Sequence, residues 1–491
     1  MKGQNVLFIM SDEHSKRVAG CYGNPVIRTP QIDRLAEQGT LFSDAYANCP
    51  ICVPSRASFA TGRYVHQIGF WDNGMPYDGS VPGWGHHLLA AGHEVVSIGK
   101  LHYRSTEDPN GFSREILPLH VLEGRGDVQG MLRRPPPHRG STRQLAGDAG
   151  EGESTYIRYD RQIREAAIGW LQDAVRSPRD KPWVLFVSFV CPHFPLMAPA
   201  EFFRMYPLDR VPMPGLRRPE EFPDHPVLRK LREVQDYEDH FRDEAHVRTA
   251  IAAYYGMVSF LDDNIGRILG ALDESGLADD TLVVYTSDHG DNLGTRTFWG
   301  KSNMYEESVG VPLVMRGPGV PRGQAVDLPV SLVDGYPTFV EVAGGRLSDQ
   351  ESAELPGHSL LRIAGGERPE RNVLSEYHAV ASITGVFMIR VGRYKYVHYE
   401  GFRPQLYDLR ADPLEATDLA LDAAHAGTLA TCARALRKLV DPAAVTAQAF
   451  ADQAARVAAL GGPEQVMRMG NYPYTPAPGE DPRYSDDLEV G

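Results

Sequence analysis

The feature that most constrains this chain is a series of short apolar runs separated by segments with helical spacing. The run Val6–Met10 is continuously apolar, which is typical of a strand buried on both faces of a sheet. Further strand-like runs are Val95–Ile98, Trp183–Val190, Thr281–Thr286 and Val311–Met315. The helical segments are Gln31–Gln38, Gly83–Ala91, Ile157–Val175, Val247–Leu272 and Leu328–Val342. This alternation predicts an α/β fold in which a large, mixed, mostly parallel sheet is sandwiched by helices.

The pattern changes near residues 370–375. Three strand-like segments follow closely, then alanine-rich helical sequence and a polar tail: Ser382–Arg390, Tyr394–Tyr399, Gln405–Asp408, Ala423–Leu460 and Asn471–Gly491. We therefore expect two domains. Residues 1–370 form the α/β domain, with loop-rich insertions at about 105–156 and 195–247. Residues 371–491 form a C-terminal subdomain with a small antiparallel sheet, helices and the tail.

Acidic side chains stand where two of the predicted strands end. Asp12 follows the first strand, and the pair Asp288-His289 follows the strand at Thr281–Thr286. In open α/β sheets ligands bind at the carboxyl ends of strands, so these residues are candidates for one shared site. Carboxylates suit Ca²⁺ or Mg²⁺, and an imidazole also admits Mn²⁺ or Zn²⁺. A carboxylate at a strand end is common without a function, so the hypothesis depends on further groups at the same edge.

A second candidate centre is Cys52, in the stretch 48–69, NCPICVPSRASFATGRYVHQIG. Pro54 suits the first turn of a helix and Gly62 suits a helix end. Cys52 is therefore predicted at a helix N-terminus, where backbone N–H groups favour an anion. This position and the nearby Arg56 predict a lowered pKa for the thiol. The alternative is an inert core side chain, because Cys is among the most often buried residue types.

The string Cys52-Val53-Pro54-Ser55-Arg56, followed by Thr61-Gly62-Arg63, resembles the signature of the sulfatase family in the alkaline-phosphatase-like superfamily. The resemblance covers most of the chain and extends to Asp412–Ala420, which is similar to the family's DPxExxDLA pattern. It implies that a formylglycine-generating or sulfatase-maturing enzyme converts Cys52 to formylglycine. The hydrated aldehyde would then be the nucleophile. Cys49 lacks the Pro-x-Arg that follows Cys52.

The resemblance also implies a metal site. Its ligands would be Asp12, Asp288, His289 and the modified Cys52, around one divalent ion. We expect Ca²⁺ first, with Mn²⁺ or Mg²⁺ as alternatives. Glu13 stands where the family often has a second Asp. Its longer side chain could reach the metal or turn away, and it is left out of the predicted ligand set.

Basic residues of the family are matched at several positions. Lys100 and His102 belong to a Gly-Lys-x-His motif, His193 to a Pro-His-x-Pro element, and Lys301 follows the Asp-His pair. The resemblance implies that Arg56 and Lys100 hold the hydrated aldehyde, and that His102 later removes a proton so that the hemiacetal sulfate collapses. His193 and Lys301 would be general acids at the leaving oxygen. Each residue alone could be a solvated Lys or a structural His. Together they predict a positively charged binding site for a sulfate.

Longer matches resemble choline sulfatases and phosphonate monoester hydrolases. Asn73, in Trp71-Asp72-Asn73, matches an asparagine that both branches keep near the transferred group, where it would bind substrate. The predicted function is hydrolysis of a sulfate ester, choline-O-sulfate-like or aryl, to inorganic sulfate and an alcohol. One alternative is phosphonate monoester or phosphodiester hydrolysis, although that branch lacks the motif of Lys100 and His102. An alternative of another class is a non-catalytic relative that only binds anions.

Composition bears on the partners of this chain. The formal net charge of −14 argues against nucleic-acid binding. The 5 cysteines are too few and too scattered for a disulfide framework. The early apolar run has the length of a strand rather than of a signal peptide, and no segment has the roughly 18 apolar residues of a membrane span. We therefore expect a cytoplasmic protein without a membrane partner, and related branches imply a homo-oligomer, either a dimer or a tetramer.

Overall fold

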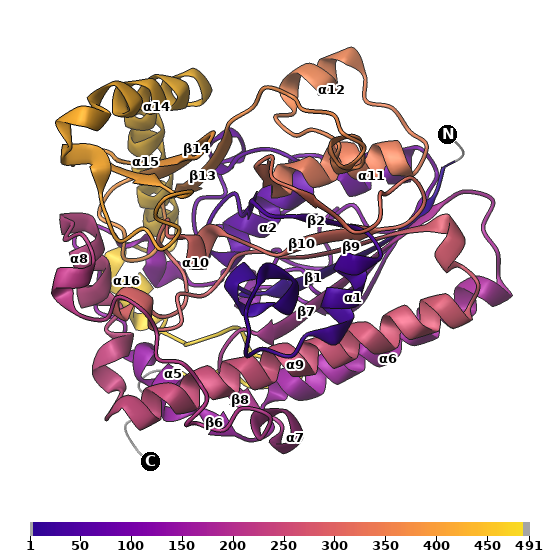
Figure 1. Ribbon diagram of the computed structural model, residues 1–491, viewed down its shortest axis with the longest axis horizontal. Helices are drawn as coiled ribbons and strands as arrows, with labels where there is room; N and C mark the ends of the chain where they lie inside the picture. Colours follow the sequence, from indigo (N-terminus) through magenta and orange to yellow (C-terminus); the bar gives the residue numbers. More distant parts are fainter. Residues whose placement is uncertain (1–2, 485–491) are drawn as a thin grey trace.

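A central sheet of eight strands organises the fold (Figure 1). The computed structural model describes residues 3–484. In the order β11-β2-β10-β9-β1-β7-β4-β5 the strands are Gln324–Val326, Thr40–Phe42, Leu313–Arg316, Thr281–Ser287, Asn5–Asp12, Trp183–Pro192, Glu94–Lys100 and Arg114–Leu119. Strands β9, β1, β7, β4 and β5 run parallel to one another. Strand β10 is antiparallel to both of its neighbours, β9 and β2. The expected mixed, mostly parallel sheet is confirmed.

Helices cover both faces of this sheet (Figure 1). One face carries α1 (Pro30–Glu37), α6 (Thr155–Arg176) and α9 (Glu244–Glu274). The other carries α2 (Cys52–Thr61), α4 (Trp84–Ala90), α11 (Gly335–Val342) and α13 (Leu360–Ala364). Alternate side chains of β1 enter the two cores: Leu7 and Ile9 pack on the first side, Val6 and Phe8 on the second. Because a strand points successive side chains to opposite faces, two cores explain the continuous apolar run.

The two predicted insertions contain more regular structure than expected. The first includes the edge strand β5, the short helix α5 (Arg143–Gly147) and β6 (Gly150–Glu151). The second includes α7 (Ala200–Phe203) and α8 (Pro226–Val234), and β8 (Met197–Ala198) pairs with β6. Short elements of this kind carry too little periodicity to be recognised in a sequence. The remaining short helices of the α/β part are α3, α10 and α12, at Val65–Ile68, Glu306–Val309 and Asp349–Glu354.

The segment Leu328–Val342 is only partly helical, which corrects the sequence prediction. Its first part forms β12 (Val330–Ser331), which pairs with β3 (Ala45–Tyr46). The backbone N–H of Ser331 donates to the Asp334 carboxylate at 2.8 Å. This contact caps the turn into α11 and ends the strand, so the helix begins only after Asp334.

The C-terminal region forms the expected antiparallel sheet. Its strands β13 to β16 are Val373–Tyr377, Val386–Val391, Tyr394–Tyr399 and Gln405–Asp408, each pairing with the next. The helices that follow are α14, α15 and α16, at Ala426–Leu439, Pro442–Ala459 and Pro463–Arg468. The buried ammonium of Lys395 lies 3.1 Å from Glu306 and 2.8 Å from Glu415, the glutamate of the DPxExxDLA-like pattern. These ion pairs tie the small sheet to the α/β part.

The carboxyl ends of the parallel strands meet at one edge of the large sheet. Asp12 ends β1, Lys100 ends β4, His193 directly follows β7, and Asp288 directly follows β9. Helix α2 begins at Cys52 and contributes the fifth segment. Parallel strands therefore bring residues from distant parts of the chain to one place. Among residues 3–484, no helix has the length and apolar character required to cross a membrane.

Candidate active site

Four side chains that could bind a metal converge at this edge. Asp12, Cys52, Asp288 and His289 are buried, and their ligand atoms all lie within 4.8 Å of one another. The Sγ of Cys52 is 3.1 Å from His289 Nε2 and 3.6 Å from Asp12 Oδ1. The Nε2 of His289 is 3.9 Å from Asp12 Oδ1 and 3.8 Å from Asp288 Oδ1. Two carboxylates and an imidazole facing one point fit a divalent cation.

The orientation of His289 suits a ligand role. Its Nδ1 lies 3.1 Å from the carbonyl oxygen of Gly290. When Nδ1 donates to that carbonyl, the lone pair of Nε2 faces the carboxylates. Asp288 is held in turn, because its Oδ1 accepts from the backbone N–H groups of His289 at 2.9 Å and of Glu13 at 3.2 Å.

Two buried cations hold the carboxylates of this cluster. The Nε of Arg56 donates to Asp288 Oδ2 at 2.8 Å, and its Nη2 donates to Asp12 Oδ2 at 3.4 Å. Lys100 forms an ion pair with the same oxygen of Asp12. Burial opposes the charge of Asp12, but Lys100, His193 and Arg56 outweigh it and hold the pKa of Asp12 well below its usual range. Arg56 and Lys100 thus contact the predicted ligands, in addition to lying beside Cys52.

The environment of Cys52 overturns one expectation. Helix α2 begins at Cys52 and ends at Gly62, which has a φ of 64° in the left-handed region, as expected from the sequence. The predicted lowering of the thiol pKa is wrong. Burial, followed by the charge of Asp12, raises the pKa of Cys52 to about 12. Dehydration of the thiolate and a carboxylate at 3.6 Å outweigh the helix terminus, so the unmodified residue is a protonated thiol.

Glu13 lies outside the cluster of four ligands, but it forms a second group of possible ligands with Asp12 and His193, whose ligand atoms lie within 4.8 Å of one another. Its backbone has a φ of 68°, and its Oε2 lies 2.8 Å from Lys301 Nζ and 3.4 Å from His193 Nε2. Burial raises the pKa of Glu13 to about 8, although Lys301 opposes the shift. Lys301 is also 3.5 Å from the Sγ of Cys52, so it bridges the thiol and Glu13. Burial and Lys301 lower the pKa of His193 well below its usual value.

Asn73 and His102 complete the residues singled out in the sequence. The Oδ1 of Asn73 accepts from the backbone N–H of Val53 at 3.2 Å, in the first turn of α2. The Nε2 of His102 lies 2.8 Å from Thr475 Oγ1. Its Nδ1 is buried and has no hydrogen-bond partner among residues 3–484. Both side chains line the same pocket as Cys52.

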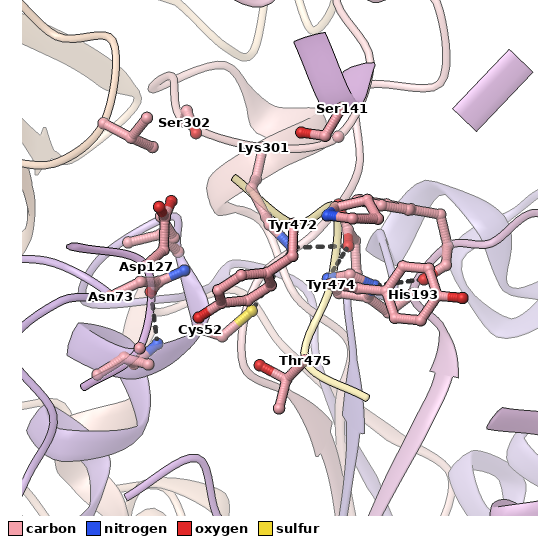
Figure 2. A pocket seen from close by; sticks show the side chains of 18 of the residues that line it. Cys52, Asn73, Asp127, Ser141, His193, Lys301, Ser302, Tyr472, Tyr474 and Thr475 are labelled. Atoms are coloured by element: carbon pink, nitrogen blue, oxygen red, sulfur yellow. Dashed lines mark hydrogen bonds and ion pairs between the residues drawn. The ribbon is translucent and has the colours of Figure 1, made fainter. Parts of the chain in front are cut away.

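This pocket has walls that the sequence analysis did not anticipate (Figure 2). The predicted insertions supply Asp127, Arg139, Ser141, Tyr156, Gln235 and Tyr237, and the C-terminal tail supplies Tyr472, Pro473, Tyr474 and Thr475. None of these residues lies in a recognisable motif or at the end of a predicted strand. Nothing in a single sequence shows which loop closes over a sheet edge, so only the folded chain identifies them.

Solved structures share this fold. The structure of the phosphonate monoester hydrolase of Agrobacterium radiobacter is 25% identical in sequence, with a TM-score of 0.70 over 89% of this chain and 95% of that one. A structure of a protein in complex with its substrate, D-glucosamine-2-N,6-O-disulfate, is 24% identical, with a TM-score of 0.72 over 92% of this chain and 99% of that one. The fold and the buried ligand set define a hydrolase of the alkaline-phosphatase-like class.

Sequence comparison identifies the family to which the chain belongs within this class of hydrolases. The sulfatase family model matches residues 4–345, and the model of the C-terminal region of N-sulphoglucosamine sulphohydrolase matches residues 294–441. The chain is 32% identical to choline-sulfatase from Rhizobium meliloti (strain 1021), over 85% of this chain and 82% of that protein. It is also 32% identical to arylsulfatase K from Danio rerio, over 85% of this chain and 80% of that protein. The chain belongs to the sulfatase family and is a sulfate ester hydrolase.

Proposed function

We propose that this chain hydrolyses sulfate esters through a formylglycine formed from Cys52 and with one divalent cation. The observation that carries the proposal is the position of Cys52. Its Sγ is 3.1 Å from His289 Nε2, 3.6 Å from Asp12 Oδ1 and 3.5 Å from Lys301 Nζ. A nucleophile at this atom would lie between the proposed metal ligands and a cation, which is where an anionic ester group would bind.

Asp12, Asp288 and His289 would hold the cation, and formylglycine at position 52 would complete the set. When bound, the cation would polarise and orient the sulfate group. The oxygen donors favour Ca²⁺, and the imidazole keeps Mn²⁺ and Mg²⁺ as alternatives. Arg56 and Lys100 form ion pairs with the two carboxylates and hold them in place. They would also offset charge on the hydrated aldehyde.

The reaction would proceed in two steps, as in covalent catalysis generally. One hydroxyl of the hydrated aldehyde would pass its proton to the carboxylate of Asp12, whose Oδ1 lies 3.6 Å from the Sγ of Cys52, and attack sulfur. The bond from sulfur to the alcohol oxygen would break, and that oxygen would take a proton from the His193–Lys301 side. A bound sulfate ester favours the protonated form of His193, because it adds negative charge beside the imidazole. His102 then accepts the proton of the second hydroxyl, the bond from carbon to the sulfate oxygen breaks, and inorganic sulfate leaves. The aldehyde is regenerated, and water hydrates it again.

Intact-mass analysis of the purified protein tests the nucleophile. Conversion of the thiol to an aldehyde removes sulfur and two hydrogens and gains oxygen, a net loss of about 18 Da at the activated cysteine. We expect this loss in the wild type and in Cys49→Ala when a maturing enzyme is co-expressed, and not in Cys52→Ala. Activity confined to samples with the mass loss supports the mechanism. Full activity of a Cys52→Ala variant contradicts it.

The ester class is tested by comparing an aryl sulfate with an aryl phosphonate monoester. We expect a higher kcat/KM for the sulfate, because Lys100 and His102 occupy a motif that resembles that of sulfatases. The structural similarity to a phosphonate monoester hydrolase makes the phosphonate the relevant competitor. A large excess of phosphonate turnover would replace our proposal with that activity. Light scattering of the same samples tests the expected dimer or tetramer.

A further inference from the structure

The C-terminal tail crosses the candidate active site. Tyr472, Pro473, Tyr474 and Thr475 line the same pocket as Cys52, and Figure 2 shows the side chains of Tyr472, Tyr474 and Thr475 around it. We call residues 471–475 the strap. The strap comes from the region beyond α16, far in sequence from every residue of the proposed catalytic set.

The strap is anchored to the walls of the pocket. The hydroxyl of Tyr156 donates to the carbonyl oxygen of Thr475 at 2.5 Å, and the Oγ1 of Thr475 lies 2.8 Å from His102 Nε2. The ring of Tyr474 packs 5.1 Å from that of Tyr156 and 6.1 Å from that of Phe194. Thr475 is only 8% exposed. These contacts make the strap part of the pocket rather than a peripheral tail.

The space beside the strap is small, and two charged side chains of its wall, Asp127 and Arg139, are paired with each other. The cavity has a volume of about 90 Å³, which is room for a sulfate and one small group. In the wall formed by the insertions, the carboxylate of Asp127 is paired with Arg139 at 2.5 Å. The rings of Tyr237 and Tyr472 also line the pocket. A quaternary ammonium requires an unpaired acid or an aromatic cage free of cations, and Arg139 opposes both.

We infer that the strap makes this enzyme selective for sulfate esters of small, uncharged alcohols, with Tyr472 as a specificity-determining residue. The inference rests on the proposed function, because it names the alcohol that this site would take. A sulfated polysaccharide would have to displace the strap and break its contacts to Tyr156 and His102. A cationic alcohol would meet the guanidinium of Arg139, and the carboxylate of Asp127 beside it is already paired with that guanidinium.

Turnover of four substrates tests the inference. The substrates are 4-nitrophenyl sulfate, a sulfated disaccharide, choline-O-sulfate and its neutral isostere 3,3-dimethylbutyl sulfate. We expect kcat/KM to be at least about tenfold higher for 4-nitrophenyl sulfate than for the disaccharide, and higher for the neutral isostere than for choline-O-sulfate. Equal or reversed preferences would overturn the inference.

Variants of the strap separate selectivity from folding. Tyr472→Ala should lower the preference for 4-nitrophenyl sulfate over the disaccharide by about tenfold, because it opens the pocket. Thr475→Val should shift the preference for 4-nitrophenyl sulfate over the disaccharide, because it removes the hydroxyl that holds the strap to His102. Thr475→Ser, which keeps a hydroxyl, should restore that preference. Pro478→Ala, at an exposed position after the strap, is the matched control and should leave the ratio unchanged. An unchanged ratio in both Tyr472→Ala and Thr475→Val contradicts the inference.

A binding measurement distinguishes failure of the strap inference from failure of the proposed function. Calorimetric titration of the Cys52→Ala variant with 4-nitrophenyl sulfate and with the disaccharide requires no turnover. Binding of 4-nitrophenyl sulfate alone supports both proposals. Equal binding of the two ligands refutes the strap inference and leaves sulfate-ester hydrolysis standing. If neither ligand binds, the result refutes the site as a sulfate-ester site.

Discussion

The Nε of Arg56 donates a 2.8 Å hydrogen bond to Oδ2 of Asp288, and both side chains are almost completely buried. Arg56 lies on α2 and Asp288 follows β9, so this contact fastens the helix that carries Cys52 to the edge of the sheet that carries the proposed ligands. The guanidinium also donates to the backbone carbonyl of Lys100 at 2.8 Å. One side chain therefore orders three segments of the candidate site.

Replacing Arg56 with Ala should damage both activity and stability. The change leaves the buried carboxylate of Asp288 without its strongest partner, which typically costs about 3–5 kcal/mol. We expect kcat to fall by more than about 100-fold, because the carboxylates lose their positions. Urea unfolding and aryl sulfate turnover measure the two effects. Arg176→Ala removes an exposed ion pair with Asp173 and should change the free energy of unfolding by less than about 1 kcal/mol.

Removal of the cation should abolish turnover and lower the melting temperature. Chelation would leave two buried carboxylates with only Arg56 and Lys100 to neutralise them. Restoring activity with Ca²⁺, Mn²⁺ or Mg²⁺ in turn identifies the ion that the site uses. His289→Ala should weaken metal binding by at least about 100-fold, as measured by bound-metal analysis after dialysis. His425→Ala, which pairs with Asp422 and belongs to neither group of possible ligands, should keep the metal. Normal metal content in His289→Ala would remove that residue from the site.

Gly99→Ala should displace Lys100. Gly99 has a φ of 98°, and an added Cβ would lie 2.2 Å from the carbonyl oxygen of Ser188. Such a position costs about 1–3 kcal/mol in backbone strain alone, and relief of the contact would move the end of β4. We expect lower thermal stability and reduced turnover. Gly169→Ala in α6, where an added Cβ has no neighbour within 4 Å, should instead be stabilising by roughly 0.5–1 kcal/mol. Equal effects of the two changes would contradict this explanation.

The ion pair between Glu376 and His66 should make the free energy of unfolding depend on pH. Burial opposes the charge of Glu376, but His66 and His378 lower its pKa from 4.5 to about 2, and Glu376 raises the pKa of His66 against the effect of burial. The contribution of Glu376 to the free energy of unfolding is complete above pH 4.5 and is lost as the pH falls toward 2. The contribution of His66 to the same free energy is complete below pH 6.5 and is lost as the pH rises through the raised pKa of His66.

Glu376→Gln should therefore destabilise the protein most between about pH 4.5 and 6.5, by about 3 kcal/mol for a shift of this size. Urea unfolding at pH 4, 5.5 and 8 measures the difference from the wild type. Asp422→Asn removes a more exposed pair with His425 and should have a much smaller effect at each pH. A constant difference for Glu376→Gln across the three pH values would exclude the ionic contribution.

Much of the framework could be predicted from the sequence because strands buried on both faces and strand-end residues leave local patterns. The run Val6–Met10 predicted β1, and its position next to Asp12 predicted where that carboxylate lies. The pattern around Cys52 predicted helix α2 and its end at Gly62. In contrast, Leu328–Val342 was expected to be one helix, because the pairing of β12 with β3 depends on a distant segment.

The pKa of Cys52 and the direction of Glu13 could not be predicted, since both depend on which side chains surround them after folding. A helix N-terminus is a local feature, but the dehydration that raises the thiol pKa requires the packed site. Likewise, Glu13 can contact Lys301 and His193 only when the end of β1 meets the segments that follow β9 and β7.

The sequence alone determined the α/β framework, the family resemblance and the residue types available at the strand ends, because these depend on short-range patterns of polarity and spacing. Only the tertiary structure decided which cation neutralises which carboxylate, and that the tail residues Tyr472 to Thr475 border the pocket. The physical reason is that contacts across hundreds of positions depend on how elements pack, and packing leaves no periodic signal in the residues that it brings together.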